Sequence, residues 1–321
     1  MKTMNKISIA LLALGCAASA NAAMKLKMGM QPSVGSVEYN SAVVLADALK
    51  ELSGGEIELA IYPSAQLGDD RAMMQQVTMG DLDFTYAEFG RVGLWLPQAA
   101  AVMQPYVIKD YDHIRRVFNS PWGLDIRKEM LDKFQWRALD TWYNGTRQTT
   151  SNRPLNKIED FKGLKLRVPN AKSLLSYAKY SGASPTPMAF SEVYLALQTN
   201  AVDGQENPLP TIKAMKFYEV QANLAMTNHV VNDQMVIMSD VTWNKLSEEQ
   251  RGFVTKAVEK AGAAHTKTVQ DQEASLVAFF ESQGVTVSYP DLTPFREAMK
   301  PLYKEFDEEI GQPVIDKVAN M

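Results

Sequence analysis

The residues of this sequence best suited to chemistry are two arginines that follow strand-like alternating runs. Arg167 closes the run that starts at Gly163, and Pro169 two residues later fixes the backbone. Arg147 follows a second alternating run, residues 136–142. A guanidinium is a rigid pair of donors that is charged at neutral pH, and two of them near strand ends suit bidentate binding of a carboxylate. Either arginine could also be a solvated surface residue, so the anion site is a hypothesis that needs further residues.

Further polar residues are expected where the strands of the first third of the chain end. They are Gln31, Asp70, Glu88 and Arg91, which would converge on one rim of a sheet. Asp69 and Asp70 begin a predicted helix, where one carboxylate can cap free backbone amides while the other faces a ligand. Glu88 and Arg91 could contact a ligand or pair with each other.

Two residues of the middle third complete the candidate set. Asn207 precedes Pro208, which favours extended backbone and leaves the Asn207 amide displayed at a strand end. Phe190 lies just ahead of Ser191, the predicted N-cap of a helix that runs to Thr199, and its residue type favours the core. Neutral polar groups and one aromatic face would suit the uncharged part of an acidic ligand.

Catalytic and metal-binding patterns are missing from the sequence. His113, His229 and His265 lie in no metal-ligand spacing and no nucleophile motif. No Gly-rich phosphate loop occurs, and neither a metal nor a cofactor is expected. Asp70 and Glu88 could act as the acid–base pair of a glycosidase, although carboxylates at strand ends bind sugar hydroxyls just as readily.

The N-terminus and the overall charge limit the class of protein. Lys2 and Lys6 precede an apolar run, and small residues follow at 20–22, which predicts a signal peptide over residues 1–22. Cys16, the only cysteine, falls inside it, and a lipidated Cys16 is the weaker alternative. The full chain has 33 basic and 37 acidic residues. Without this segment, which contains Lys2 and Lys6, 31 basic residues remain against 37 acidic ones, a net charge of about −6. No basic stripe is present, so nucleic acid is not an expected partner.

The elements that must position the candidate residues alternate between strand and helix patterns. This order predicts an α/β fold with a parallel sheet and ligands beyond the carboxyl ends of its strands. A second sheet is expected to carry Arg147 and Arg167 at the ends of successive strands. A long helical pattern with a capping box at Ser247 and Gln250 could bridge two lobes. The predicted strands are 26–30, 56–62, 82–87, 136–142, 230–238 and 285–289, and the predicted helices are 42–49, 68–79, two within 111–134, 171–180, 191–199, 247–282 and 294–306.

Four stretches carry a resemblance to a known family: QLGDDRAM at 66–73, YNGTRQTTSNR at 143–153, and the segments 163–170 and 182–208. With them the chain closely resembles the extracytoplasmic substrate-binding proteins of TRAP (tripartite ATP-independent periplasmic) transporters, specifically the sialic-acid-binding members. The resemblance extends over essentially all of residues 23–321.

The resemblance implies a two-lobed periplasmic binding protein fold with hinge strands and a long helix shared by both lobes. Lobe I would comprise residues 23–144 and 233–272, lobe II would comprise 145–232 and 273–300, and 301–321 would be a C-terminal helical segment. The resemblance also implies a periplasmic monomer that captures sialic acid (N-acetylneuraminate) by cleft closure and delivers it to the ion-gradient-driven membrane subunits.

The same resemblance implies a role for each candidate residue of lobe II. Arg167 would form a two-pronged salt bridge with the sialic acid carboxylate, and Arg147 and Asn207 would add hydrogen bonds to it. Asn170 and Phe190 would line the sugar. An enclosed carboxylate needs a fixed cationic donor pair, which agrees with an arginine at the centre of the site.

In lobe I, the resemblance implies that Asp70, Glu88 and Arg91 meet the hydroxyl-rich tail and the ring substituents. Gln31 would lie near the N-acetyl group, although some relatives have Asn at that position. Two alternatives stay open: the same scaffold could bind another sugar acid or a dicarboxylate, or the protein could be an enzyme that processes sialic acid with Asp70 or Glu88 as acid or base.

Overall fold

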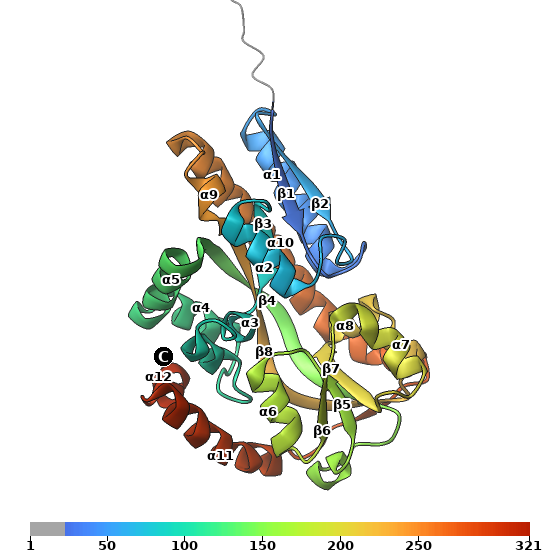
Figure 1. Cartoon of the computed structure of the whole chain (residues 1–321). Helices are drawn as coiled ribbons and strands as arrows, with labels where there is room; N and C mark the ends of the chain where they lie inside the picture. Colours follow the sequence, from blue (N-terminus) through green and yellow to red (C-terminus); the bar gives the residue numbers. More distant parts are fainter. Residues whose placement is uncertain (1–22) are drawn as a thin grey trace, which may run out of the picture.

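One mixed β-sheet organises the described part of the chain, residues 23–321 of a computed structural model (Figure 1). The strands within this part are β1 (Met24–Gly29), β2 (Ile57–Tyr62), β3 (Phe84–Ala87), β4 (Trp136–Ser151), β5 (Lys165–Val168), β6 (Ser184–Pro187), β7 (Gly204–Pro208), β8 (Asn223–Ser239) and β9 (Thr286–Ser288). Their order is β2-β1-β3-β8-β4-β7-β5-β6, with β9 beside β8. The predicted signal peptide, residues 1–22 with Cys16, lies outside the described residues.

The sheet carries a lobe at each end, and two long strands join the lobes (Figure 1). β4 has 16 residues and β8 has 17, and they pair antiparallel along most of their length. β8 also pairs with β3 of the first lobe, and β4 also pairs with β7 of the second. The predicted α/β class is confirmed. The expectation of a separate second sheet is wrong, because β4 and β8 are long enough to continue one hydrogen-bonded sheet through both lobes.

Local capping chemistry explains where the helices begin. Asp69 accepts a hydrogen bond from Ala72 N at the start of α2, as the sequence predicts for one of its two aspartates. The predicted cap at Ser191 is wrong: Ala189 N donates to Glu192, so the chain forms a short 3₁₀ turn before α7. The α-helices are α1 (Val37–Leu52), α2 (Asp70–Met79), α3 (Phe89–Val92), α4 (Tyr111–Asn119), α5 (Pro121–Phe134), α6 (Lys172–Tyr180), α7 (Val193–Gln198), α8 (Leu209–Ala214), α9 (Asp240–Trp243), α10 (Glu248–Ser282), α11 (Thr293–Ile310) and α12 (Val314–Ala319), and the 3₁₀ helices are η1 (Pro97–Met103), η2 (Ile158–Phe161), η3 (Phe190–Glu192) and η4 (Phe217–Glu219).

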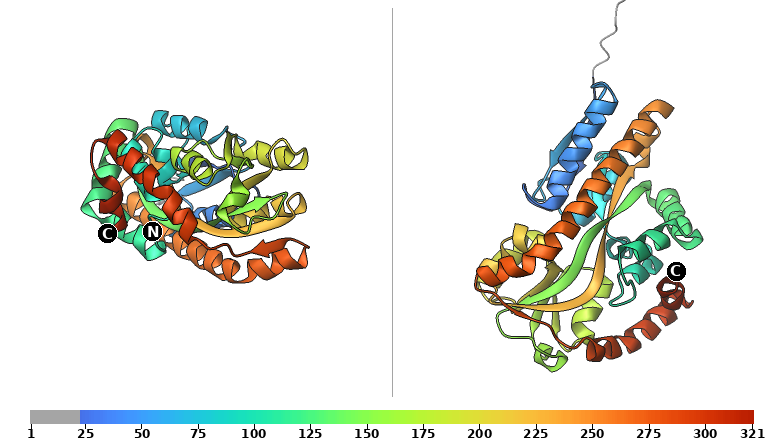
Figure 2. Two further views of the ribbon diagram at one scale, coloured as in Figure 1. Left: turned by 90° about the horizontal axis from the view of Figure 1, so that it is seen from below. Right: turned by 180° about the vertical axis from the view of Figure 1, so that it is seen from behind.

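Helix α10 packs against both lobes, as Figure 2 shows from behind. It begins with the predicted capping box, in which Ser247 and Gln250 bond reciprocally, and it continues for 35 residues. It packs against α1 of the first lobe and α8 of the second. Gly262 lets α10 approach β4 closely, since an added Cβ there would lie 2.3 Å from Trp142 Nε1. The prediction of one long helix that bridges two lobes is confirmed.

Each lobe has apolar side chains of its own behind the sheet. In the first lobe, residues such as Leu45, Phe84 and Val258 form one buried cluster that includes Trp142. In the second, Leu209, Phe217, Leu276 and Phe280 belong to another. A third, larger cluster joins the lobes, since it contains Met74 and Leu82 of the first and Leu166 and Leu174 of the second. Fully burying one such side chain contributes about 1.5–3 kcal/mol, so apolar packing stabilises each lobe and the connection between them.

Strand β4 is interrupted by a bulge where it passes from one lobe to the other. Its pairing with β8 shifts register between Tyr143 and Thr146, and Gly145 has a φ of +89°. Glu273 of α10 fixes this segment: it accepts hydrogen bonds from Thr146 N at 2.7 Å and from the Tyr143 hydroxyl at 2.6 Å. We call residues 143–146 the hinge bulge. Asn144 within the hinge bulge and Arg147 just after it line the site described below.

The hinge bulge predicts a strong effect of Gly145→Ala on stability. Alanine disfavours a positive φ, and its Cβ would lie 2.9 Å from Pro208 Cβ. The left-handed conformation alone costs about 1–2 kcal/mol, and the close contact adds to it. We expect urea denaturation to show a loss of at least about 1 kcal/mol. Gly252→Ala in α10 is the control, because nothing lies within 4 Å of its added Cβ and alanine favours the helix. Equal effects of the two substitutions would contradict this account.

Candidate functional site

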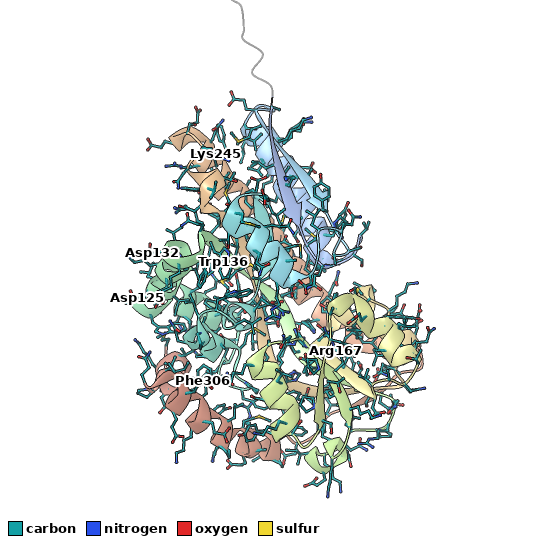
Figure 3. The ribbon with its side chains drawn as sticks, viewed as in Figure 1. Asp125, Asp132, Trp136, Arg167, Lys245 and Phe306 are labelled. Carbon is teal, nitrogen blue, oxygen red and sulfur yellow. The ribbon has the colours of Figure 1, made fainter. Side chains whose placement is uncertain are left out.

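All nine residues predicted from the sequence line one cavity of about 370 Å³ between the lobes. A cavity of this size suits a small organic ligand. Figure 3 labels Arg167, which lies among the strands of the second lobe. The first lobe contributes Gln31, Asp70, Glu88 and Arg91, and the second contributes Arg147, Arg167, Asn170, Phe190 and Asn207. Direct ligand contact by each of them stays a prediction.

Arg167 is a buried cation with few protein partners. Its side chain comes from β5, just before Pro169 as the sequence predicts, and the residue is 1% exposed. Its Nη2 donates to Met188 O at 2.8 Å, whereas its buried Nε has no hydrogen-bond partner within residues 23–321. The guanidinium also lies 5.9 Å from the centre of the Phe190 ring. Removing a charge from water without pairing it is costly, so this arrangement is suited to an anion that enters the cavity.

The environment of Arg167 predicts a pH dependence of binding. Burial lowers the pKa of Arg167 to about 9, and the charges of Arg147 and Arg91 act in the same direction, against Glu206 and Asp70. A bound carboxylate favours the charged guanidinium. The affinity for an acid should therefore be constant near neutral pH and fall about tenfold per pH unit as the pH rises above about 9.

Calorimetry at several pH values tests this dependence, with circular dichroism at each pH to verify that the protein stays folded. A constant affinity from about pH 7 to pH 10.5 in a folded protein would contradict it.

Arg147, in contrast, is held by an ion pair with Glu206. Its Nε and Nη2 donate to the Glu206 carboxylate, Nη2 also donates to Asn207 Oδ1 at 3.1 Å, and Nη1 donates to Asn232 Oδ1 at 3.0 Å. The prediction that Arg147 ends a strand is wrong, since it lies inside β4, past the hinge bulge. Of the five guanidinium N–H groups, one on Nη1 is left without an acceptor in the described residues, and it is the group that could reach a ligand.

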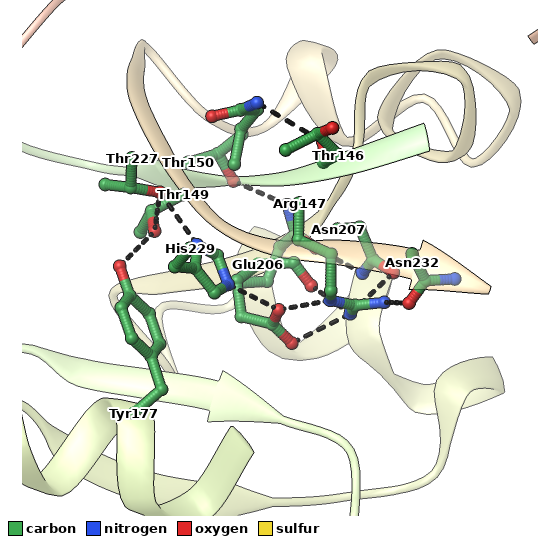
Figure 4. Close-up of polar contacts among 12 residues, drawn as sticks. Thr146, Arg147, Thr149, Thr150, Tyr177, Glu206, Asn207, Thr227, His229 and Asn232 are labelled. Carbon is green, nitrogen blue, oxygen red and sulfur yellow. Dashed lines mark hydrogen bonds and ion pairs between the residues drawn. The ribbon is translucent and has the colours of Figure 1, made fainter. Parts of the chain in front are cut away.

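A buried hydrogen-bonded chain continues from Glu206 away from the cavity (Figure 4). Burial disfavours the charged form of Glu206, but Arg147 and the hydrogen bond from His229 outweigh it and lower the pKa of Glu206. Burial lowers the pKa of His229, so its neutral ring donates through Nε2 to Glu206 and accepts at Nδ1 from Thr227. The ring also stacks on Tyr177 at 3.8 Å. The chain fixes the Glu206 carboxylate, and the carboxylate fixes Arg147.

On the opposite wall, Arg91 pairs with Asp70 and not with Glu88. The ion pair has a distance of 2.6 Å, and Arg91 Nη1 reaches Asn170 O of the second lobe at 3.5 Å. Burial raises the pKa of Glu88, with Arg91 and Arg147 acting against it. Asp69 and Asp70 both line the cavity, and Asp69 also caps α2, which confirms the predicted cap; ligand contact by Asp70 stays a prediction.

The remaining predicted residues differ in exposure. Asn207 is buried in β7, where its Nδ2 donates to Gln205 Oε1 at 2.6 Å. Asn170 lies exposed at the rim, and Gln31 is half-buried. Phe190 is half-buried and packs edge-on against Phe217 at 6.2 Å, so it borders the cavity while its far side contacts the core. The expectation that Phe190 belongs to the core is thus only partly correct.

Sequence reasoning missed a second set of polar residues at the site. Each of them lies either in a strand of the sheet or at the start of α1, at a place where an apolar residue would be expected. A polar triplet at 232–234 interrupts the otherwise apolar residues 230–238 of β8, and this interruption is visible in the sequence. No comparable signal marks the others. The missed residues are Glu38, Tyr86, Asn144, Asn232 and Gln234, which line the cavity, and Glu206, which holds Arg147.

Residues 23–321 contain neither a metal-binding cluster nor a membrane-spanning helix. No group of three or more His, Cys, Asp or Glu side chains there is arranged to hold a metal ion. Among the helices of the same residues, none combines the length and the apolar character needed to cross a bilayer.

Comparison with known proteins assigns the chain to one family. Residues 28–309 match the family model of the bacterial extracellular solute-binding proteins, family 7, and the chain belongs to this family. It is 74% identical over 321 residues to the "Sialic acid-binding periplasmic protein SiaP" of Vibrio cholerae, and the match covers 100% of both chains.

Solved structures of TRAP periplasmic solute-binding proteins share the two-lobed fold. One, from Polaromonas sp. JS666 with bound D-erythronate, is 34% identical, has a TM-score of 0.86, and matches over 92% of this chain and 98% of its own. Another, from Roseobacter denitrificans with bound 3-deoxy-D-manno-oct-2-ulosonic acid, is 30% identical, has a TM-score of 0.87, and matches over 93% and 99%. The two-lobed arrangement predicted from the sequence is confirmed.

Proposed function

We propose that this protein is a periplasmic solute-binding protein that captures sialic acid (N-acetylneuraminate) and delivers it to the membrane subunits of an ion-gradient-driven TRAP transporter. The observation that carries the proposal is Arg167, a buried guanidinium without an ion pair in the described residues, which lines a cavity of small-molecule size. The 74% identity to a sialic acid-binding protein supports the choice of ligand.

The ligand carboxylate binds Arg167 through two N–H groups, and the free N–H of Arg147 and the amide of Asn207 add hydrogen bonds. Asn170 and Phe190 border the sugar from the same lobe. From the other lobe, Asp70, Glu88, Arg91 and Gln31 meet the hydroxyls and ring substituents. Charge-assisted bidentate pairs are the strongest of these contacts, so the carboxylate determines the orientation of the sugar.

Contacts to both lobes stabilise the closed cleft. The hinge bulge and α10 connect the lobes, which we divide as 23–144 with 233–272 and 145–232 with 273–300, followed by 301–321. In this division, the contact of Arg91 with Asn170 O crosses from one lobe to the other. The protein acts as a monomer, reaches the periplasm through a cleaved signal peptide at residues 1–22, and carries out no chemical step.

Calorimetry of residues 23–321 against a panel of acids tests the proposal. We expect one-to-one saturable binding of N-acetylneuraminate, and mass spectrometry should recover the ligand unchanged. A new product would favour the enzyme alternative with Asp70 or Glu88 as acid or base. No heat and no rise in melting temperature with N-acetylneuraminate would refute the proposed ligand.

The alternative with a specific observation behind it is another sugar acid. Solved relatives of similar fold contain D-erythronate and 3-deoxy-D-manno-oct-2-ulosonic acid, so one fold serves acids of different length. Both acids belong in the panel. Tighter binding of either one than of N-acetylneuraminate would establish this alternative.

A further inference from the structure

The two walls of the cavity carry opposite charge. The second lobe contributes Arg147 and Arg167 as its charged lining residues, and Arg147 is offset by Glu206 behind it. The first lobe contributes more carboxylates than arginines: Glu38, Asp69, Asp70 and Glu88 against Arg71 and Arg91. A ligand in this cavity therefore meets a cation at one side and an excess of carboxylates at the other.

Glu38 is the carboxylate of this wall that the proposed contacts leave without a role. It comes from the first turn of α1, is only 6% exposed, and lines the cavity. The side chain has no ion pair in residues 23–321, whereas Asp70 pairs with Arg91. Burial raises the pKa of Glu38, and the groups that oppose this are its own backbone amide, Ser36 and Asn144, none of which is charged.

A structural role for Glu38 does not account for its position. The N-terminus of α1 is already capped, because Ser36 accepts a hydrogen bond from Tyr39 N at 3.0 Å. An acidic residue in a first turn is favourable near the helix dipole, but a solvated carboxylate gains this as well. The gain is small beside the cost of taking an unpaired carboxylate out of water. Tyr86, which donates to the backbone oxygen of Glu38 at 3.2 Å, would do so with any side chain at position 38.

We infer that Glu38 is a specificity-determining residue, which makes the wall opposite Arg167 accept neutral hydrogen-bonding groups of the ligand and exclude a second carboxylate. The inference rests on the proposed function and narrows its ligand class. The site takes acids with one negative charge whose remaining groups are uncharged and carry hydroxyls or amides. A second carboxylate beside Glu38 would be desolvated next to another carboxylate, because the arginines of that wall are Arg91, which is already paired with Asp70, and Arg71, which is exposed to solvent. Discrimination of this kind comes from a repulsive contact and needs no extra affinity for the correct ligand.

Matched acid and amide derivatives of N-acetylneuraminate test the inference. One pair carries a carboxylate or a carboxamide at C9, and the other carries an N-succinyl or an N-succinamoyl group in place of N-acetyl. Within each pair the size is nearly constant and the charge differs. For the wild type we expect calorimetry to show at least tenfold weaker binding of the acid in the pair that faces Glu38. In Glu38→Gln this ratio should fall at least fivefold.

Asp47→Asn is the matched control, because this substitution removes one negative charge from the same helix at an exposed position. Its acid-to-amide affinity ratios should equal those of the wild type. If Glu38→Gln binds the two acid derivatives no better than the wild type does, the inference is overturned. This includes the case in which neither protein binds them measurably. The melting temperature of Glu38→Gln verifies folding. Binding of N-acetylneuraminate by the wild type tests the proposed function separately, so the two failures are distinguishable.

Discussion

Replacing Arg167 by alanine should remove most ligand binding and leave the unliganded protein as stable as before. Losing one partner of a charge-assisted pair in a closed site costs about 2–5 kcal/mol, which corresponds to a loss of affinity of about 30-fold to several thousand-fold. Stability should not fall, because Arg167 has one hydrogen bond and no ion pair in the described residues, and its burial opposes its charge. Arg167→Lys should recover little, since one ammonium cannot reproduce the two-pronged geometry.

Calorimetry gives the affinities, and thermal unfolding without ligand gives the stabilities. Arg153→Ala is the control: it removes an exposed arginine of the same lobe and should change neither measurement. Near-wild-type affinity of Arg167→Ala would show that the ligand carboxylate binds elsewhere.

Glu206→Ala, unlike Arg167→Ala, should strongly destabilise the unliganded protein. Glu206 is fully buried and accepts hydrogen bonds from Arg147 and His229. Removing it leaves the Arg147 guanidinium buried without its counter-ion, which costs about 3–5 kcal/mol. The melting temperature of the unliganded protein should fall by several degrees. Ligand affinity should fall too, because Arg147 loses the partner that orients it.

Two further variants separate stability from binding. The double variant Arg147→Met, Glu206→Met removes both charges and should recover much of the lost stability without recovering binding. Glu309→Ala breaks the exposed pair with Lys172, where an ion pair contributes about 0–1 kcal/mol, and should change the melting temperature little. If Glu206→Ala were no more destabilising than Glu309→Ala, the buried pair would not hold Arg147 in place.

The sequence predicted best the features that depend on local chemistry. Asp69 and Ser247 begin their helices because the capping pattern involves residues three apart, which can be read directly from the chain. Arg167 lies near the end of β5 because Pro169 follows it. The candidate residues of the first lobe follow β1 and β3 or begin α2, so local patterns were enough to select them.

Features that depend on pairing between distant strands could not be predicted in this way. Residues 143–151 are polar and contain Asn144-Gly145, which resembles a loop, yet they continue β4 because both neighbours, β7 and β8, supply hydrogen bonds. Glu206 stays buried only because β7 pairs with β4 and brings it to Arg147. Ser191 satisfied the local capping rule, but the turn formed by Ala189 and Glu192 took precedence.

The continuity of β4 and β8 through both lobes affects how the protein folds. β4 pairs with β8 in both lobes, so neither lobe retains its complete set of strands when it is separated from the other. A fragment that ended at the hinge bulge would expose unpaired edges of β4 or β8. We therefore expect the two lobes to unfold as one cooperative unit, and we expect any ligand-dependent movement to be a bend within β4 and β8, which stay paired.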